Sequence, residues 1–137
     1  MSNNEAIIGG GDIGKATAKA LGIKNIFDEL KERGNMSAQK VGKFKYLFIC
    51  VSTPSTSSGC DISHVEEVIE KFGKEHIYII RSTVIPGTAA MLMEKYGCMI
   101  VSNPEFLTEA TAEEDAAIPD IIVIGNGGSV SSLRAIH

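Results

Sequence analysis

Short apolar runs recur along the chain, and each is followed by a turn signal and then by a stretch with helical spacing. Strands that alternate with helices in this way are typical of βαβ units on a parallel sheet. The pattern therefore predicts a compact α/β domain with a doubly wound, mainly parallel sheet of about six strands. The predicted strands are 5–9, 25–28, 46–51, 77–81, 98–102 and 121–125.

The segments between these runs have the spacing and the end signals of helices. Ser63 precedes Glu66 by three residues, which is a capping-box pattern at the start of a helix. Pro86 near a first turn and Gly97 after a last turn show the usual asymmetry of helix ends. The predicted helices are 12–21, 63–72, 86–96 and a shorter one at 105–110.

Two connecting segments lack such patterns. Ser55–Cys60 is small and polar, so we expect a mobile loop there. Between Asp28 and Tyr46 there is room for a turn of helix and a loop but little for a strand, so the usual third strand is predicted to be missing. No repeat or long linker interrupts the chain, and residues 1–137 are predicted to form one domain.

Composition narrows the function classes. The chain has 137 residues, of which 44% are hydrophobic and 22% charged, the balance of one globular domain with a core. The net charge of -4, with acids and bases mixed, offers neither a basic stripe for nucleic acid nor a cationic face for a membrane. No run approaches the roughly 20 apolar residues of a membrane span, and the polar start does not resemble a signal peptide. We therefore expect a small ligand and a cytoplasmic protein.

The cysteines and histidines suggest no metal site. Cys50, Cys60 and Cys98 form no CxxC pair, and their odd number argues against a disulfide framework. Apolar neighbours place Cys50 and Cys98 in the predicted core, whereas His64 and His76 are expected at the surface.

A glycine-rich turn gives the first indication of chemistry. Gly9, Gly11 and Gly14 form G-x-G-x-x-G between the first predicted strand and its helix, which is the Rossmann arrangement. The motif needs a tight turn at Gly9, a bare backbone at Gly11 for a pyrophosphate, and close packing at Gly14. Asp28 ends the second predicted strand, where an acid holds a ribose and favours NAD over NADP. The alternative is an ordinary strand-to-helix turn with Asp28 as a solvated strand end.

Three later segments follow the carboxyl ends of predicted strands, where open α/β sheets bind ligands. They are 51–54, 82–88 and 103–115. Thr53 and Thr83 offer hydroxyls, and Glu105 and Glu109 are four apart, so they share one face of a helical turn. Neighbouring carboxylates in a crevice acquire separated pKa values, as general acid or base catalysis requires. Taken singly, Thr83 is also explained as a capping hydroxyl and Glu109 as an exposed helical acid.

These motifs, VSTP, STVIPGT and NPEFLTEATAEED, together with IGGGDIG, resemble the UDP-glucose/GDP-mannose dehydrogenase family in sequence and order over nearly the whole chain. The resemblance implies an NAD-binding domain of an enzyme that oxidises a sugar nucleotide to the uronic acid in two hydride transfers. It assigns to the cofactor Gly9, Gly11, Asp12, Ile13, Gly14, Asp28, Arg33, Val51, Thr53, Ser82, Thr83 and Glu109. It assigns to the sugar nucleotide Glu105, Phe106, Leu107, Thr108 and Glu109.

The same resemblance implies catalytic roles for Thr83, which orders a water, and for Glu105 and Glu109 as candidate acids or bases. The family forms a thioester on a cysteine of a carboxyl-terminal domain, a place that none of the cysteines here occupies. Thr108 replaces a basic residue, which removes a phosphate or carboxylate partner.

Two main hypotheses follow from the sequence. The chain is the cofactor half of a dehydrogenase whose catalytic half comes from a second chain or is missing, with a homo-oligomer as a further option. Alternatively, it is a module that binds NAD or a nucleotide without chemistry. A third hypothesis, kinship with the 6-phosphogluconate and hydroxyacid dehydrogenases, explains the glycine turn but not NPEFL.

Overall fold

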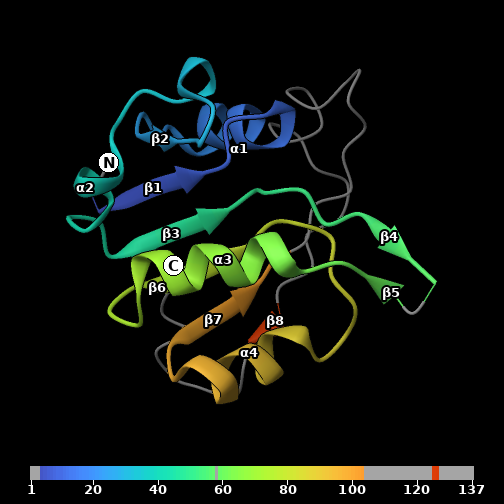
Figure 1. Ribbon diagram of the computed structural model, residues 1–137. Coiled ribbons are helices and arrows are strands. Elements are labelled where there is room, and N and C mark those ends of the chain that lie inside the picture. Colours follow the sequence, from blue (N-terminus) through green and yellow to red (C-terminus); the bar gives the residue numbers. More distant parts are fainter. Residues whose placement is uncertain (1–3, 58, 104–124, 127–137) are drawn as a thin grey trace.

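The protein is described by a computed structural model that covers residues 4–57, 59–103 and 125–126. Its main sheet has the strand order β2-β1-β3-β6-β7-β8 (Figure 1). All neighbours from β2 to β7 pair in parallel, and β8 runs antiparallel to β7. This confirms the predicted doubly wound, mainly parallel sheet. The strands are β1 (Glu5–Ile8), β2 (Ile26–Phe27), β3 (Tyr46–Ile49), β6 (Ile77–Ile80), β7 (Met99–Ser102) and β8 (Gly125–Asn126).

Both long amphipathic helices form where the spacing predicts them, α1 at Asp12–Leu21 and α3 at Ser63–Phe72. The helix α4 (Thr88–Tyr96) begins later than the predicted 86–96. Gly87 has a φ of 88°, outside the helical region, and the Thr88 hydroxyl donates to the Ile85 carbonyl. The predicted helix 105–110 lies outside the described residues, as does the predicted strand 121–125 apart from Gly125.

The helices lie on both faces of the sheet. Ala6 and Ile8 of β1 belong to the main core cluster together with Val65 and Ile69 of α3. The intervening Ile7 faces the other side, where a Cβ on Gly14 of α1 would lie 3.3 Å from its methyl group. Figure 1 shows α3 and α4 side by side in front of the sheet. This arrangement follows from right-handed crossovers that leave β1 and β3 in opposite directions along the sheet.

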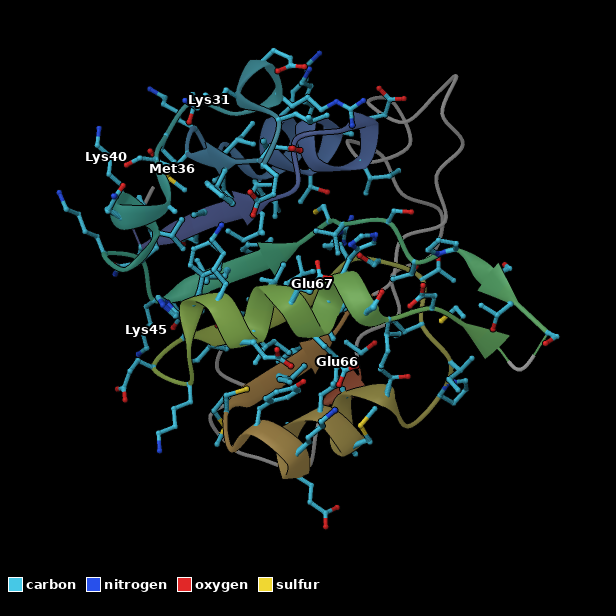
Figure 2. All side chains as sticks on the ribbon, in the orientation of Figure 1. Lys31, Met36, Lys40, Lys45, Glu66 and Glu67 are labelled. Carbon is cyan, nitrogen blue, oxygen red and sulfur yellow. The ribbon has the colours of Figure 1, made fainter. Side chains whose placement is uncertain are left out.

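The predicted capping box of Ser63 and Glu66 does not form at the first turn of α3. Ile62, not Ser63, precedes the helix, and the Ser63 amide donates to Asp61 Oδ1 over 2.9 Å. Glu66 turns instead toward α4, where its carboxylate accepts from Lys95 Nζ at 2.6 Å and Tyr96 Oη at 2.9 Å. Figure 2 shows Glu66 between the two helices. Glu66, which the local pattern assigned to the cap, therefore makes a tertiary contact with α4 instead.

Of the two connecting segments that lack helix and strand signals, Ser55–Cys60 differs from its prediction, and the connection between β2 and β3 agrees with its prediction. Ser55–Cys60 is not an irregular loop, because β4 (Ser55–Thr56) and β5 (Gly59–Cys60) pair as an antiparallel hairpin. Between β2 and β3 the chain forms the 3-10 turn η1 (Lys31–Arg33) and the short helix α2 (Ala38–Val41). Residues 28–45 are all described and contain no strand, as predicted. The sheet therefore ends at β2 on this side.

The burial of the cysteines agrees with the prediction, whereas the burial of one histidine does not. Cys98 is buried as predicted, and Cys50 is partly buried. His76, expected at the surface, is only 6% exposed, and its Nδ1 lies 2.6 Å from the Phe44 carbonyl oxygen. A backbone partner makes this burial of a polar ring tolerable.

Candidate functional site: the glycine turn and its cleft

The first and last glycines of the motif are required by packing. Gly9 has a φ of 107°, a region that L-residues rarely adopt, and a Cβ there would lie 2.8 Å from the Cys50 carbonyl oxygen. A Cβ on Gly14 would overlap the Gly9 carbonyl. The first glycine thus allows the tight turn after β1, and the last allows α1 to lie against it.

Gly11 differs from both, because none of the described residues crowds it. It stands at the N-cap of α1 with an ordinary φ of -76°, and no atom of these residues lies within 4 Å of the place a Cβ would take. The amides of the first helical turn have no acceptor within the helix. An open approach to these amides, at the positive end of the helix dipole, is the geometry that an anionic group needs.

Asp28 is fixed against the glycine turn by both of its oxygens. Oδ2 accepts from the Gly10 amide at 2.7 Å, and Oδ1 accepts from the Leu30 amide at 2.8 Å. Each carboxylate oxygen has a second lone pair, so the group retains the capacity to accept from a ligand hydroxyl.

Gly10 is a site residue that the motif analysis missed. A Cβ on Gly10 would collide with the Arg33 carbonyl, because η1 crosses directly over the turn. The only signal in the sequence is the extra glycine in IGGGDIG, since the consensus leaves this position open.

A cleft of about 860 Å³ opens at the glycine turn, within the usual range for small-molecule sites. The turn, the end of β2, η1 and one face of α3 form its walls. Lys15 and Arg33 contribute positive charge to the lining, and Asp28, Glu29 and Glu67 contribute negative charge. The predicted cofactor residues that line it are Gly9, Gly11, Asp12, Ile13, Asp28, Arg33 and Val51.

The loops after β3 and β6 are tied together beside this cleft. The Thr53 hydroxyl donates to the Thr83 carbonyl at 2.6 Å. Ser82 is 6% exposed, and its hydroxyl donates to the Val51 carbonyl at 2.6 Å. The Asn103 amide donates to the Ile80 carbonyl, so the end of β7 reaches the same edge. The four predicted residues from the first two loops therefore lie together, whereas Glu105, Phe106, Leu107, Thr108 and Glu109 lie outside the described residues.

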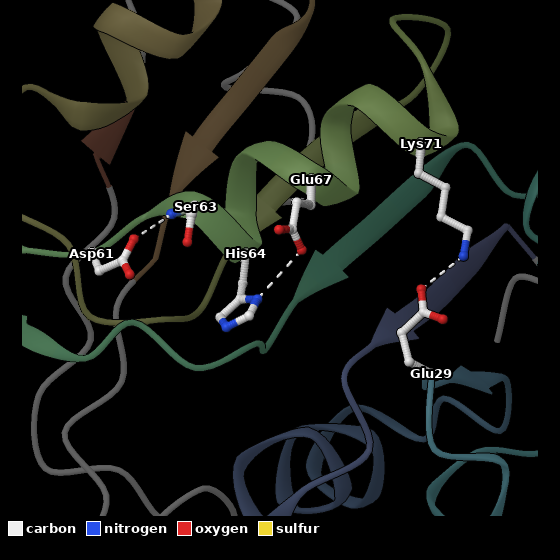
Figure 3. A network of polar contacts seen from close by, with 6 residues as sticks. All are labelled: Glu29, Asp61, Ser63, His64, Glu67 and Lys71. Atoms are coloured by element: carbon white, nitrogen blue, oxygen red, sulfur yellow. Dashed lines mark hydrogen bonds and ion pairs between the residues drawn. The ribbon is translucent and has the colours of Figure 1, made fainter.

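Polar side chains of α3 form the wall opposite the glycine turn (Figure 3). His64 Nδ1 lies 3.4 Å from Glu67 Oε2, and Lys71 Nζ lies 2.7 Å from Glu29 Oε1 after β2. At the start of the helix the Ser63 amide and hydroxyl hold the pKa of Asp61 below its ordinary value. Sequence reasoning missed Glu29 and Lys71, which are separated by 42 positions and share no motif.

Neither a metal site nor a membrane-spanning helix is found among the described residues. They contain no group of three or more His, Cys, Asp or Glu side chains placed to hold a metal ion. Among them, no helix combines the length and the apolar character that crossing a membrane requires.

Comparison with known proteins decides the family. Residues 14–136 match the profile of the UDP-glucose/GDP-mannose dehydrogenase family, NAD binding domain. The chain belongs to this family. The family's domain of this type binds NAD, so NAD is the cofactor, as predicted. The matched region begins at Gly14, and the preceding part of the glycine turn is therefore supported by its own geometry.

Named relatives agree with this membership. UDP-glucose 6-dehydrogenase of Rickettsia bellii is 43% identical over 103 residues, 66% of this chain and 24% of that protein. GDP-mannose 6-dehydrogenase of Pseudomonas aeruginosa is 31% identical over 136 residues, 82% of this chain and 31% of that protein. The chain thus spans between about a quarter and a third of these relatives' length.

Solved structures show the same fold. A UDP-glucose dehydrogenase from Pyrobaculum islandicum superposes with a TM-score of 0.76 at 24% identity, covering 99% of this chain and 43% of that one. A GDP-mannose dehydrogenase ternary complex from Pseudomonas aeruginosa gives a TM-score of 0.72 at 22% identity, with coverages of 97% and 43%.

Proposed function

We propose that this chain is the cofactor half of a nucleotide-sugar 6-dehydrogenase, which oxidises UDP-glucose or a similar sugar nucleotide to the uronic acid. The observation that carries the proposal is the uncrowded Gly11 at the start of α1, beside a carboxylate fixed by the same turn. This arrangement leaves room for a diphosphate next to a ribose.

In this proposal each part of the cleft holds one part of NAD. The first amides of α1, from Gly11 through Ile13, bind the diphosphate, and Lys15 and Arg33 add positive charge. Asp28 accepts from the adenosine ribose hydroxyls. Val51, Thr53 and Thr83 lie toward the nicotinamide, and Ser82 acts through Val51, whose carbonyl it holds. When bound, NAD supplies the chemistry of the site by accepting a hydride from the substrate.

The sugar-nucleotide side of the proposal rests on family membership alone. Glu105 through Glu109 meet the substrate, Glu105 and Glu109 serve as acid or base, and Thr83 orders a water. In the family the nucleophilic cysteine of the covalent intermediate lies in a carboxyl-terminal domain, a place that none of Cys50, Cys60 and Cys98 occupies. We therefore propose that full turnover requires residues outside this chain, supplied by a second, different chain. A cytoplasmic location remains a prediction.

Calorimetric titration with NAD tests the binding function, with Gly11→Val as the decisive variant. The valine side chain enters open space, so the variant should fold, yet it covers the amides and should weaken NAD binding at least about tenfold. Gly42→Val is the matched control, because Gly42 ends α2 with a φ of -58° and lies outside the cleft lining. The control should bind NAD as the unaltered protein does. Equal indifference of all three proteins to saturating NAD would refute the proposal.

A second candidate is a module that binds NAD without chemistry. It is favoured by Thr108, which stands where the resemblance expects a basic partner for the sugar nucleotide. The two candidates agree on NAD binding and differ on turnover.

A further inference from the structure

The ion pair between Glu29 and Lys71 lies at the ribose end of the cleft. Glu29 directly follows Asp28, and Lys71 belongs to the last turn of α3. All three residues line the cleft, and Figure 3 shows the Lys71 side chain reaching from α3 across the sheet edge to Glu29. The Nζ–Oε1 distance is 2.7 Å.

Lys71 is held at this place by more than its acidic partner. Its ammonium lies 4.9 Å from the centre of the Phe27 ring and 5.8 Å from that of Phe72. The two rings pack edge to face with their centres 5.4 Å apart, which fixes both. Cation–π attraction therefore keeps the ammonium at the cleft even when Glu29 is replaced.

Stability does not account for the pair. The side chains of Glu29 and Lys71 are 75% and 41% exposed, and ion pairs this exposed contribute little to folding. What distinguishes this ion pair is its location in the lining of the cleft, beside Asp28. Without Glu29, an uncompensated ammonium would stand beside the carboxylate that we assign to the adenosine ribose.

We propose that Glu29 is a second determinant of the preference for NAD over NADP, acting by neutralising Lys71. NADP differs from NAD by a phosphate on the ribose 2′-oxygen, next to Asp28 in the binding mode proposed above, on which this inference rests. Glu29 excludes that phosphate in two ways: it adds a second carboxylate to the site, and it occupies the Lys71 ammonium, with which a phosphate would otherwise pair. Asp28 alone repels the phosphate but does nothing to Lys71.

The test is a double-mutant cycle of Glu29→Gln and Lys71→Met, with the dissociation constants of NAD and NADP measured by calorimetry. Glu29→Gln should lower the ratio of the NADP to the NAD dissociation constant about fivefold, mainly through tighter NADP binding. In the Lys71→Met background the same substitution should change the ratio less than about twofold, because only the repulsion is relieved.

Glu70→Gln is the matched control. Like Glu29→Gln, it removes one negative charge next to Lys71, here from the preceding residue in the sequence. Glu70, however, contacts Tyr96 of α4 and lies outside the cleft lining. Its ratio should equal that of the unaltered protein. NADP binding as weak in Glu29→Gln as in the unaltered protein, or an equal gain with and without Lys71, would overturn the inference. Failure of the unaltered protein to bind NAD would instead refute the proposed function, so the two failures are distinguishable.

Discussion

At the scale of single residues, the four glycines around the first turn serve different purposes. Gly9 is needed for its backbone conformation, Gly10 and Gly14 for the lack of a side chain, and Gly11 for the space it leaves to a ligand. Substitutions at these positions should therefore separate folding from binding, although all lie within one short motif.

Gly10→Ala should damage both properties together. Its Cβ would collide with the Arg33 carbonyl, which must move along with the Asp28 carboxylate bonded to the same turn. We expect the free energy of unfolding in urea to fall by about 1 to 3 kcal/mol, as for other overpacked sites, and NAD binding to weaken. Gly42→Ala, where the nearest atom to a Cβ would be 3.8 Å away, should change neither. Unchanged stability of Gly10→Ala would show that η1 does not press on the turn.

At the scale of elements, α3 has two functional sides. One packs Glu66 and Glu70 against Tyr96 of α4, and the other presents His64, Glu67 and Lys71 to the cleft. The helix thus links the packing of the second half of the sheet to the wall of the cofactor site.

The contact with α4 should make stability depend on acid pH. The hydrogen bond from Lys95 holds the pKa of Glu66 below its ordinary value of 4.5, with a further contribution from Tyr96. Because the folded pKa is the lower one, this stabilisation is complete above pH 4.5 and is lost as the pH falls through the folded value. Glu66→Gln should therefore unfold at lower urea concentration at neutral pH, and its difference from the unaltered protein should shrink below pH 4.5.

Glu94→Gln removes an exposed acid of α4 outside this contact and serves as the control. A difference between Glu66→Gln and the unaltered protein that stayed constant across the acid range would argue against ionisation as its source.

At the scale of the whole molecule, the cleft lies at one edge of the sheet, where the carboxyl ends of the strands meet. The carboxyl ends of β1, β2 and β3 frame the cleft, and hydrogen bonds between the following loops bring in the ends of β6 and β7. The outer strand beyond β2 is absent from residues 28–45, and η1 lies over the glycine turn instead. The shortened connection thus serves as part of the cofactor site.

A turnover assay belongs to this scale. At micromolar protein with NAD and UDP-glucose, absorbance at the NADH band should not rise for the chain alone, because in our proposal residues from outside this chain complete the substrate site. NADH formed only after a second chain is added would support the split dehydrogenase, and NAD binding with no NADH under any condition would support the module. NADH produced by the chain alone would contradict both.

Local pattern predicted much of the fold. The helices Asp12–Leu21 and Ser63–Phe72 were correct to the residue, because hydrophobic spacing is a property of the segment itself. The glycine motif likewise predicted the turn and Asp28 beside it, and the position of two later motifs at strand ends predicted that the Thr53 and Thr83 loops meet. The failures at the Ser63–Glu66 capping box and at His76 have one origin, because Glu66 and His76 bond to partners far along the chain, Lys95 and Phe44.

The sequence by itself determined the order of the main-sheet strands and the long helices, the glycine turn and the family, because each is encoded by motifs that are short and local in the chain. Only the tertiary structure decided that Arg33 covers Gly10, that Glu66 binds α4 and that Lys71 reaches Glu29. These contacts join segments far apart in sequence, and their partners are selected by how the helices pack on the sheet rather than by any local preference.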